Sequence, residues 1–228
     1  MPFAKAWELQ KVLFDARREG HIADTLLLLE HDPVITLGRG SHPKNIVASP
    51  QKLAELGIAV AEIDRGGDVT FHGPGQLVAY PIFDLSVDRR DVRKYVADLR
   101  RVMAGICAPF GVDAGELPQM IGAWVDLADP SRYDAAHVRQ PAKIGAIGVR
   151  ISRWVTMHGF ALNVSTKLAY FSNIVPCGIS EHPVTSLAEL VGDKAPSIEQ
   201  AAALADTAFA HVFGAQVHRM TAPNEWMA

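Results

Sequence analysis

The chain is 228 residues long and 49% of its residues are hydrophobic, so it can bury one substantial core but is short for two independent ones. We expect a single domain over residues 1–228. The formal net charge of -3 provides no excess of basic groups for neutralising phosphates, which excludes nucleic acid as an expected partner. The two cysteines are too few for a disulfide scaffold, so a reducing compartment is expected.

The first 20 residues carry charges throughout and contain no continuous apolar run, which excludes a secretory signal. Their apolar residues recur close to helical spacing and predict a helix that ends at Gly20. The apolar run at residues 26–29 is too short to cross a bilayer. We therefore expect a soluble, cytoplasmic protein without membrane contact.

The pattern of apolar residues and of turn-forming residues predicts the elements that follow. Residues 51–56 form a short helix, with Ser49 as N-cap, Pro50 at the first position and Gly57 after the end. Helices are also predicted at residues 92–110 and 197–213, the second capped by Ser197. Strands are predicted at residues 25–30, 33–37, 58–63, 77–85, 122–125, 144–151 and 155–164.

The connections between these elements indicate the fold class. Residues 65–76 are rich in glycine and are expected to form a loop, and residues 152–154 are expected to form a tight hairpin turn. Residues 126–141 are polar and predict a surface loop. Strands follow one another with helices between them, without strict alternation, which predicts an α+β fold with a mixed or antiparallel sheet flanked by helices.

The glycine-rich stretch RGGDVTFHGPGQ, residues 65–76, is the most informative segment. Its glycines permit close approach of a ligand to the backbone, but on the glycines alone a plain turn between strands is the favoured explanation. The spacing matches neither a phosphate-binding loop nor a dinucleotide fingerprint. Four polar residues in this stretch, which would cost desolvation if they were buried only for packing, favour a ligand-binding loop: Arg65, Thr70, His72 and Gln76.

Cys177 is the candidate nucleophile because it lies between proline and glycine in the sequence IVPCGIS, where Gly178 leaves a backbone amide accessible to an oxyanion. Cys107 falls on a predicted helix among apolar residues and is expected to be a core residue. A lone cysteine is a weak signal, and a nucleophilic thiolate needs a partner. Lys143, His72 and His158 are candidates, although a solvated lysine and a core histidine are the common alternatives.

Several motifs resemble those of the lipoyl(octanoyl) transferase family and occur in the family's order. They are RGGDVTFHGPGQLVAYP at 65–81, KIGAIGVR at 143–150, MHGFALNV at 157–164, VPCGI at 175–179 and VTSL at 184–187. The similarity extends over residues 29–190. The resemblance implies a fold shared with the catalytic domains of biotin and lipoate protein ligases. It also implies transfer of octanoyl from acyl carrier protein to a lysine of lipoyl domains, in 2-oxoacid dehydrogenase E2 subunits and in the glycine cleavage H protein.

The resemblance also assigns residues. Cys177 matches the nucleophile that forms the acyl-thioester intermediate, and Lys143 matches the lysine paired with it. Gln76 and His158 are expected to support the site, and no metal or cofactor is expected. The substrate-binding residues implied are Arg65, Gly66, Gly67, Asp68, Val69, Thr70, Phe71, His72, Ala146, Ile147, Gly148, Gly159, Phe160 and Ala161.

An acyl-thioester mechanism needs no ATP, because exchange of one thioester for another is nearly isoenergetic. We expect Lys143 to stabilise the thiolate and later to accept the proton of the attacking amine, with His72 supporting the pair or the substrate carbonyl. The small residues Gly145, Ala146 and Gly148 are expected to leave space for the alkyl chain.

Three alternatives remain open at this stage. The first is an ATP-dependent lipoate or biotin ligase of the same fold. The second is a zinc site of His72, His158 and Cys177, in a hydrolase or a structural metal protein, although no HExxH or paired CxxC motif supports it. The third is a carrier-binding module without catalysis. The loop at 126–141 is longer than the family's usual turn, and its Arg132 and Arg139 are candidates for contact with an acidic carrier.

Overall fold

The computed structural model describes residues 1–175 and 182–220. The α-helices in this part of the chain are α1 (Phe3–Arg18), α2 (Pro50–Glu55), α3 (Val92–Cys107), α4 (Leu187–Val191) and α5 (Ile198–Phe213). The strands are β1 (Thr25–Leu29), β2 (Val34–Leu37), β3 (Ala59–Glu62), β4 (Val69–His72), β5 (Gln76–Ile82), β6 (Gly115–Leu117), β7 (Met120–Asp126), β8 (Pro141–Ser152) and β9 (Val155–Asn163). Short 3-10 turns include η1 (Pro43–Asn45), η2 (Ala108–Phe110) and η3 (Leu168–Asn173).

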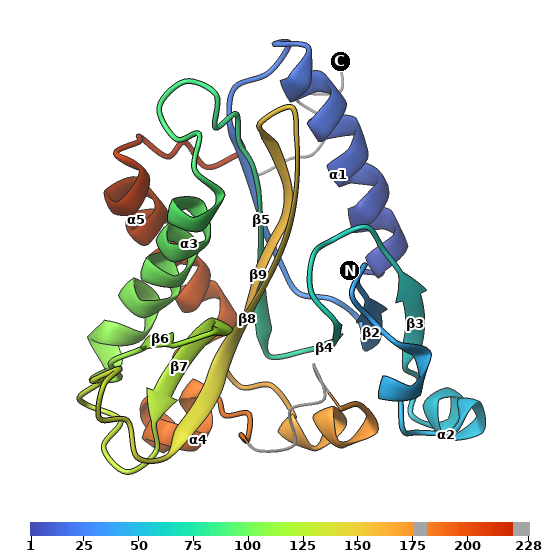
Figure 1. Ribbon diagram of the computed structural model, residues 1–228, viewed down its shortest axis with the longest axis vertical. Helices are drawn as coiled ribbons and strands as arrows, with labels where there is room; N and C mark the ends of the chain where they lie inside the picture. Colours follow the sequence, from blue (N-terminus) through green and yellow to red (C-terminus); the bar gives the residue numbers. More distant parts are fainter. Residues whose placement is uncertain (176–181, 221–228) are drawn as a thin grey trace.

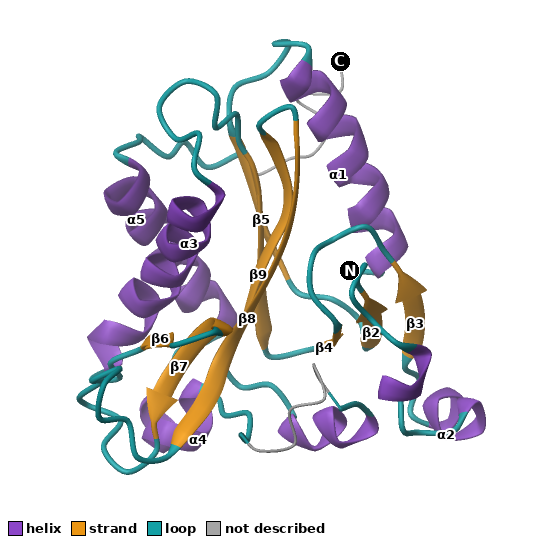
Figure 2. Ribbon diagram, viewed as in Figure 1, coloured by secondary structure: helices purple, strands orange, loops and turns teal. Residues whose placement is uncertain are grey.

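The strands form two sheets (Figure 2). The larger has the order β1-β5-β9-β8-β7-β6, and every neighbouring pair in it is antiparallel. The smaller has the order β3-β2-β4, with β2 parallel to β3 and antiparallel to β4. The predicted α+β class with mixed and antiparallel pairing is confirmed.

Helices cover both faces of the larger sheet (Figure 1). On one face α3 and α5 pack together against β5, β7, β8 and β9 and enclose the main core, where Leu99, Met103 and Phe209 are buried. On the other face α1 places Leu13 and Phe14 against strand residues. The smaller sheet lies on the α1 side and has its own core with α2 and η3 (Figure 1).

Local sequence signals specify several of these elements as expected. The β8–β9 hairpin turns through Arg153 and Trp154, both with positive φ (51° and 67°), as a two-residue hairpin turn requires. Ser197 and Gln200 form a reciprocal capping box at the start of α5, and Gly214 ends that helix with φ 63°.

The predicted loop at residues 65–76 is wrong in its second half, because residues 69–72 form β4. Val69 and Phe71 point into the core of the smaller sheet, and His72 pairs with Val34 of β2. A four-residue strand bounded by glycines carries too short an alternation to stand out from a glycine-rich loop.

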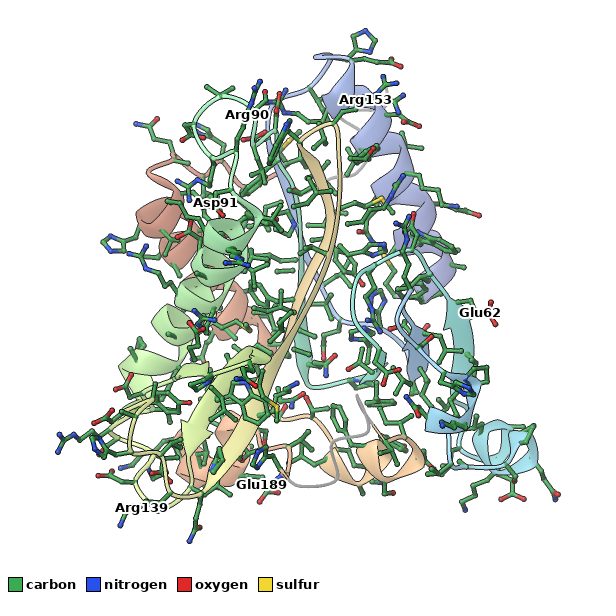
Figure 3. All side chains as sticks on the ribbon, in the orientation of Figure 1. Glu62, Arg90, Asp91, Arg139, Arg153 and Glu189 are labelled. Atoms are coloured by element: carbon green, nitrogen blue, oxygen red, sulfur yellow. The ribbon has the colours of Figure 1, made fainter. Side chains whose placement is uncertain are left out.

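The polar loop between β7 and β8 is confirmed, and the buried carboxylate of Asp126 closes its base. This carboxylate accepts hydrogen bonds from the backbone N–H groups of Ala128 (2.9 Å), Arg139 (3.0 Å) and Gln140 (3.0 Å). Figure 3 shows Arg139 at the periphery of the molecule, away from the two cores. Among the described residues, no helix has the length and apolar character needed to cross a membrane.

Candidate active site

A cavity of about 430 Å³ opens beside β8, between the glycine-rich segment and β9, within the size range of small-molecule sites. Among the residues implied by the family resemblance, those lining it are Arg65, Gly66, Gly67, Asp68, Val69, Thr70, His72, Gln76, Lys143, Ala146, Ile147, Gly148, His158, Gly159, Phe160 and Ala161. Phe71 does not line it, because its ring is buried against Tyr170, with 5.1 Å between ring centres. Four separate motifs are thus brought to one cavity, since Val184 of the VTSL motif lines it as well.

The glycine-rich segment crosses β8 in direct contact with it. The backbone N–H of Gly66 donates to the carbonyl of Val149 at 2.9 Å. Arg65 is buried and donates to Thr36 of β2, to the backbone carbonyl at 2.8 Å and to the hydroxyl at 2.9 Å. A Cβ at Gly148 would lie 2.9 Å from both Arg65 Cδ and the carbonyl oxygen of Gly66. The segment therefore reaches the strand only because residue 148 has no side chain.

Gly148→Ala is expected to displace this segment, cost about 1–3 kcal/mol of stability and lower the rate of substrate turnover about 10- to 100-fold. Chemical denaturation and steady-state kinetics measure the two effects. Gly105→Ala on α3 is the control, since Gly105 is exposed and away from the cavity, and its Cβ would meet only Ala208 Cβ of α5, at 3.2 Å. A Gly148→Ala protein as active as the Gly105→Ala control would contradict the importance of this crossing.

Gly145, Ala146 and Gly148 all line the cavity, so the expectation that they leave space for an alkyl chain stays a prediction, although neither glycine could carry a side chain. A Cβ at Gly145 would collide with the sulfur of Met103 on α3, and one at Gly148 would meet Arg65 and Gly66. The space beside each glycine is already filled by protein atoms.

A β-bulge in β8 places Lys143 at the cavity. Lys143 pairs with Trp124 of β7, whereas Gly145 pairs with the residue before Trp124, so β8 has one extra residue at this point. Regular alternation would put residues three apart on opposite faces of the sheet. The bulge instead leaves Ile144 in the core under α3 and brings both Lys143 and Ala146 to the cavity.

The side chain and the backbone of Lys143 both have defined neighbours. Its Nζ lies 4.8 Å from the ring centre of Trp124, in cation–π geometry. Its backbone N–H donates to the carbonyl of Pro183 (2.9 Å) and its carbonyl accepts from Thr185 N–H (2.9 Å). The chain that follows residue 181 is therefore held against β8 at Lys143.

Of the two cysteines, the structure describes only Cys107. Cys177, the predicted nucleophile, lies outside the described residues. Cys107 is completely buried in the main core, and burial raises the pKa of its thiol to about 12. Its predicted role as a core residue is confirmed, and it has almost no thiolate at neutral pH.

His72 is buried at the end of β4 beside the cavity. Its Nδ1 lies 2.7 Å from Gln76 Oε1, and its Nε2 lies 3.5 Å from Thr36 Oγ1. Burial lowers the pKa of His72 to about 3, so the ring is neutral at physiological pH.

His158 reaches the cavity through an unusual backbone conformation. Phe160 and Leu162 point into the core under α3 and α5, and alternation along β9 would send His158 the same way. Its φ of 61° turns the side chain toward Asp64, where Nε2 lies 2.9 Å from Oδ1. Burial lowers the pKa of His158 although Asp64 opposes that shift. Left-handed strain at a buried non-glycine residue is characteristic of functional sites.

The zinc alternative finds no support in the described part of the chain, which contains no group of three or more histidine, cysteine, aspartate or glutamate residues placed to hold a metal ion. One ring nitrogen of His72 is engaged by Gln76 and one of His158 by Asp64. The third ligand of that alternative, Cys177, lies outside the described residues.

Residues that the sequence did not single out also belong to this region. His31 lies with its Nε2 2.6 Å from the hydroxyl of Tyr80, and burial lowers the pKa of His31 to about 4. Asn163 at the end of β9 lines the cavity and bonds Gln76. In the sequence, His31 stands out only as a histidine inside an apolar stretch, and Asn163 only as an asparagine at the end of an apolar strand. Either pattern also occurs in residues that serve only structure, so neither identifies a site residue.

The fold and the site together define a class of protein. The sequence model of the lipoyl protein ligase A/B catalytic domain matches residues 2–210, and this chain belongs to that family. The chain is 48% identical to an octanoyltransferase of Myxococcus xanthus over 215 residues, which cover 94% of this chain and 57% of that protein. It is also 48% identical to an octanoyltransferase of Koribacter versatilis over 218 residues, covering 94% of this chain and 82% of the relative.

Solved structures show the same fold at low sequence identity. A bi-partite lipoate protein ligase from Thermoplasma acidophilum has a TM-score of 0.70 at 15% identity, covering 94% of this chain and 82% of that one. A lipoate-protein ligase A bound with ATP has a TM-score of 0.68 at 18% identity, covering 94% and 84%. The expected lipoate-ligase fold is confirmed.

Proposed function

We propose that this protein transfers an octanoyl group from octanoyl-acyl carrier protein to a specific lysine of lipoyl domains, in the cytoplasm and without ATP. The observation that carries the proposal is a cavity that joins the glycine-rich segment to Lys143, in a chain 48% identical over 94% of its length to proteins named octanoyltransferase. The lipoyl-domain acceptor is supported by the related fold of a lipoate protein ligase described together with its E2 lipoyl domain.

In the proposed mechanism the Cys177 thiolate attacks the thioester carbonyl of the donor. The carbon–sulfur bond to the carrier breaks, the carrier leaves as a thiol, and octanoyl remains on Cys177 as a thioester. The neutral amine of the acceptor lysine then attacks this thioester, the bond to Cys177 breaks, and the amine gives up a proton to form the amide. Lys143 stabilises the thiolate as an ammonium and gives its proton to the departing carrier sulfur. The neutral amine that remains then accepts the proton of the acceptor lysine in the second half.

Two features of the cavity suit this chemistry. Backbone amides of the glycine-rich segment, other than the Gly66 amide that donates to Val149, would stabilise the oxyanion, where one well-placed donor typically contributes about 3 kcal/mol. Apolar side chains from α3, β7 and the segment before α4 provide contacts for an alkyl chain: Val96, Ile121 and Val184. Burial of six methylenes at about 0.8 kcal/mol each is worth roughly 5 kcal/mol, enough to discriminate octanoyl from short acyl groups.

An ATP-dependent ligase is the second candidate, favoured by the fold likeness to a lipoate-protein ligase A bound with ATP. The two functions differ in their donor. Purified protein, octanoyl-carrier and an apo lipoyl domain, mixed without ATP, are expected to yield a lipoyl domain heavier by one octanoyl group. Free octanoate with ATP and magnesium is expected to yield none. The reverse pattern, measured by intact-protein mass spectrometry, would replace the transferase with the ligase, and binding of the carrier without either reaction would indicate a carrier-binding module.

A further inference from the structure

A continuous file of hydrogen bonds runs beneath the cavity from the glycine-rich segment to the backbone next to Lys143. Its members, in order, are Arg65, Thr36, His72, Gln76, Asn163 and Thr185. All six are buried. They come from separate parts of the chain: Gln76 and Asn163 are 87 positions apart and Asn163 and Thr185 are 22 apart.

The two ends of the file determine the direction of every hydrogen bond in it. The guanidinium of Arg65 only donates, and the peptide carbonyl of Thr185 only accepts. Asn163 must therefore turn Nδ2 toward Thr185, at 2.9 Å, and Oδ1 toward Gln76, also at 2.9 Å. The partners of Asn163 therefore determine which of its amide atoms is the oxygen and which is the nitrogen.

The orientation of Gln76 follows in turn. Its Nε2 donates to Asn163 Oδ1 and to the carbonyl of Phe71 (3.2 Å), which uses both protons of the amide. Its Oε1 is left to accept from His72 Nδ1 at 2.7 Å. His72 therefore carries its single proton on Nδ1 and a lone pair on Nε2. A ring in this state accepts a hydrogen bond at Nε2 and cannot donate one to an acyl oxygen from that atom.

At its other end, the file holds the backbone beside the predicted catalytic lysine. Asn163 anchors the carbonyl of Thr185, whose N–H donates to the carbonyl of Lys143 at 2.9 Å. One side chain thus acts in both directions: it orients Gln76 and His72, and it holds the chain paired with Lys143.

We propose that Asn163 is a positioning residue for acyl transfer, which fixes His72 as a hydrogen-bond acceptor at Nε2 and holds the Thr185 backbone against Lys143. The catalytic part of this inference rests on the proposed octanoyl transfer. The hydrogen-bond polarity does not, and the two are tested separately.

The first test is histidine NMR of the wild-type protein labelled with ¹⁵N-histidine, with the His72 signals assigned by their loss in His72→Gln. The expected result is a protonated Nδ1 and an unprotonated Nε2 throughout pH 5 to 8. A proton on Nε2, or a doubly protonated ring in that range, would overturn the proposed polarity. This measurement requires no catalytic activity.

The second test uses Asn163→Asp, which keeps the shape of the side chain and replaces the donor facing Thr185 with an acceptor. The expected result is a 10- to 100-fold lower kcat, with KM for octanoyl-carrier within about twofold of wild type. Asn173→Asp is the matched control, because Asn173 is buried and donates to the Tyr170 carbonyl at 2.8 Å without belonging to the file. Circular dichroism confirms that each variant is folded at the assay temperature.

The kinetic outcomes separate a positioning role from a structural one. If Asn163→Asp loses stability but retains wild-type kcat per folded molecule, or matches Asn173→Asp in kcat, the proposal is overturned. Asn163→Leu removes the hydrogen bonds of residue 163 to Gln76 and to Thr185, and is expected to give mixed tautomers at His72 in the NMR spectrum. An unchanged tautomer would show that Asn163 does not determine the tautomer of His72. If wild-type protein transfers no octanoyl, the proposed function fails, while the wild-type NMR result still decides the polarity.

Discussion

Cys177→Ser is expected to lower octanoyl transfer by at least about 10³-fold, because a serine hydroxyl is a poor nucleophile without a strong base beside it. The wild-type protein mixed with octanoyl-carrier, without acceptor or ATP, is expected to gain the mass of one octanoyl group. That adduct is expected to be released by hydroxylamine, as a thioester is, and to be absent from the variant.

Cys107→Ala supplies the control within the same chain. Cys107 is completely buried on α3 and its pKa is raised to about 12, so it is expected to take no acyl group. The variant should lose about 1 kcal/mol of stability and retain full adduct formation. An adduct that persists in Cys177→Ser and disappears in Cys107→Ala would refute the assignment, and a wild-type protein that forms no adduct while transferring octanoyl would exclude the covalent intermediate.

Much of the architecture could be predicted from the sequence because its signals are local. Ser197 with Gln200 specifies a helix start, and Ser49 followed by Pro50 specifies another. The motif segments likewise identify most residues of the cavity, since each segment carries its polar groups within a few positions. These features depend on neighbours in the chain and not on distant contacts.

The missed features depend on contacts between distant segments. β1 and β2 are consecutive in the chain, yet they join different sheets, and only their partners β5 and β4 decide this. The bulge that brings Lys143 to the cavity is set by register against β7, and strand periodicity alone would place Lys143 and Ala146 on opposite faces.

The chemistry of the histidines also depends on distant partners. His31 meets Tyr80 across 49 positions of the chain, and His158 meets Asp64 across 94. The sequence predicts that His72 is a polar group of a loop that supports the Lys143–Cys177 pair or the substrate carbonyl. Only the buried partners reveal which of its nitrogens holds the proton, because the direction of each hydrogen bond propagates from Arg65 and Thr185.

Lys143→Met is expected to lower the rate of octanoyl transfer about 10²- to 10³-fold, because it removes both the positive charge that stabilises a thiolate and the group that accepts the amine proton. The rate at which iodoacetamide alkylates the Cys177 thiol, measured as a function of pH, reports the loss of the positive charge alone. Without the ammonium, thiolate formation is expected to require a higher pH than in the wild-type protein.

Lys143→Arg divides the two roles, since arginine keeps the charge but does not act as a base near neutral pH. It is expected to retain the wild-type alkylation profile while transfer to the acceptor amine remains slow. Lys11→Met is the matched control: Lys11 Nζ lies 4.3 Å from the ring centre of Trp7 on α1, the same kind of lysine–tryptophan contact as Lys143 makes with Trp124 at 4.8 Å, but outside the cavity. If Lys11→Met and Lys143→Met slow transfer equally, loss of cation–π packing explains both and Lys143 has no chemical role. If Lys143→Met slows transfer and Lys11→Met does not, Lys143 has a chemical role. If Lys143→Arg also keeps the wild-type rate of alkylation, then charge stabilisation and proton transfer are two separable contributions of the Lys143 side chain, which the β-bulge holds at the cavity.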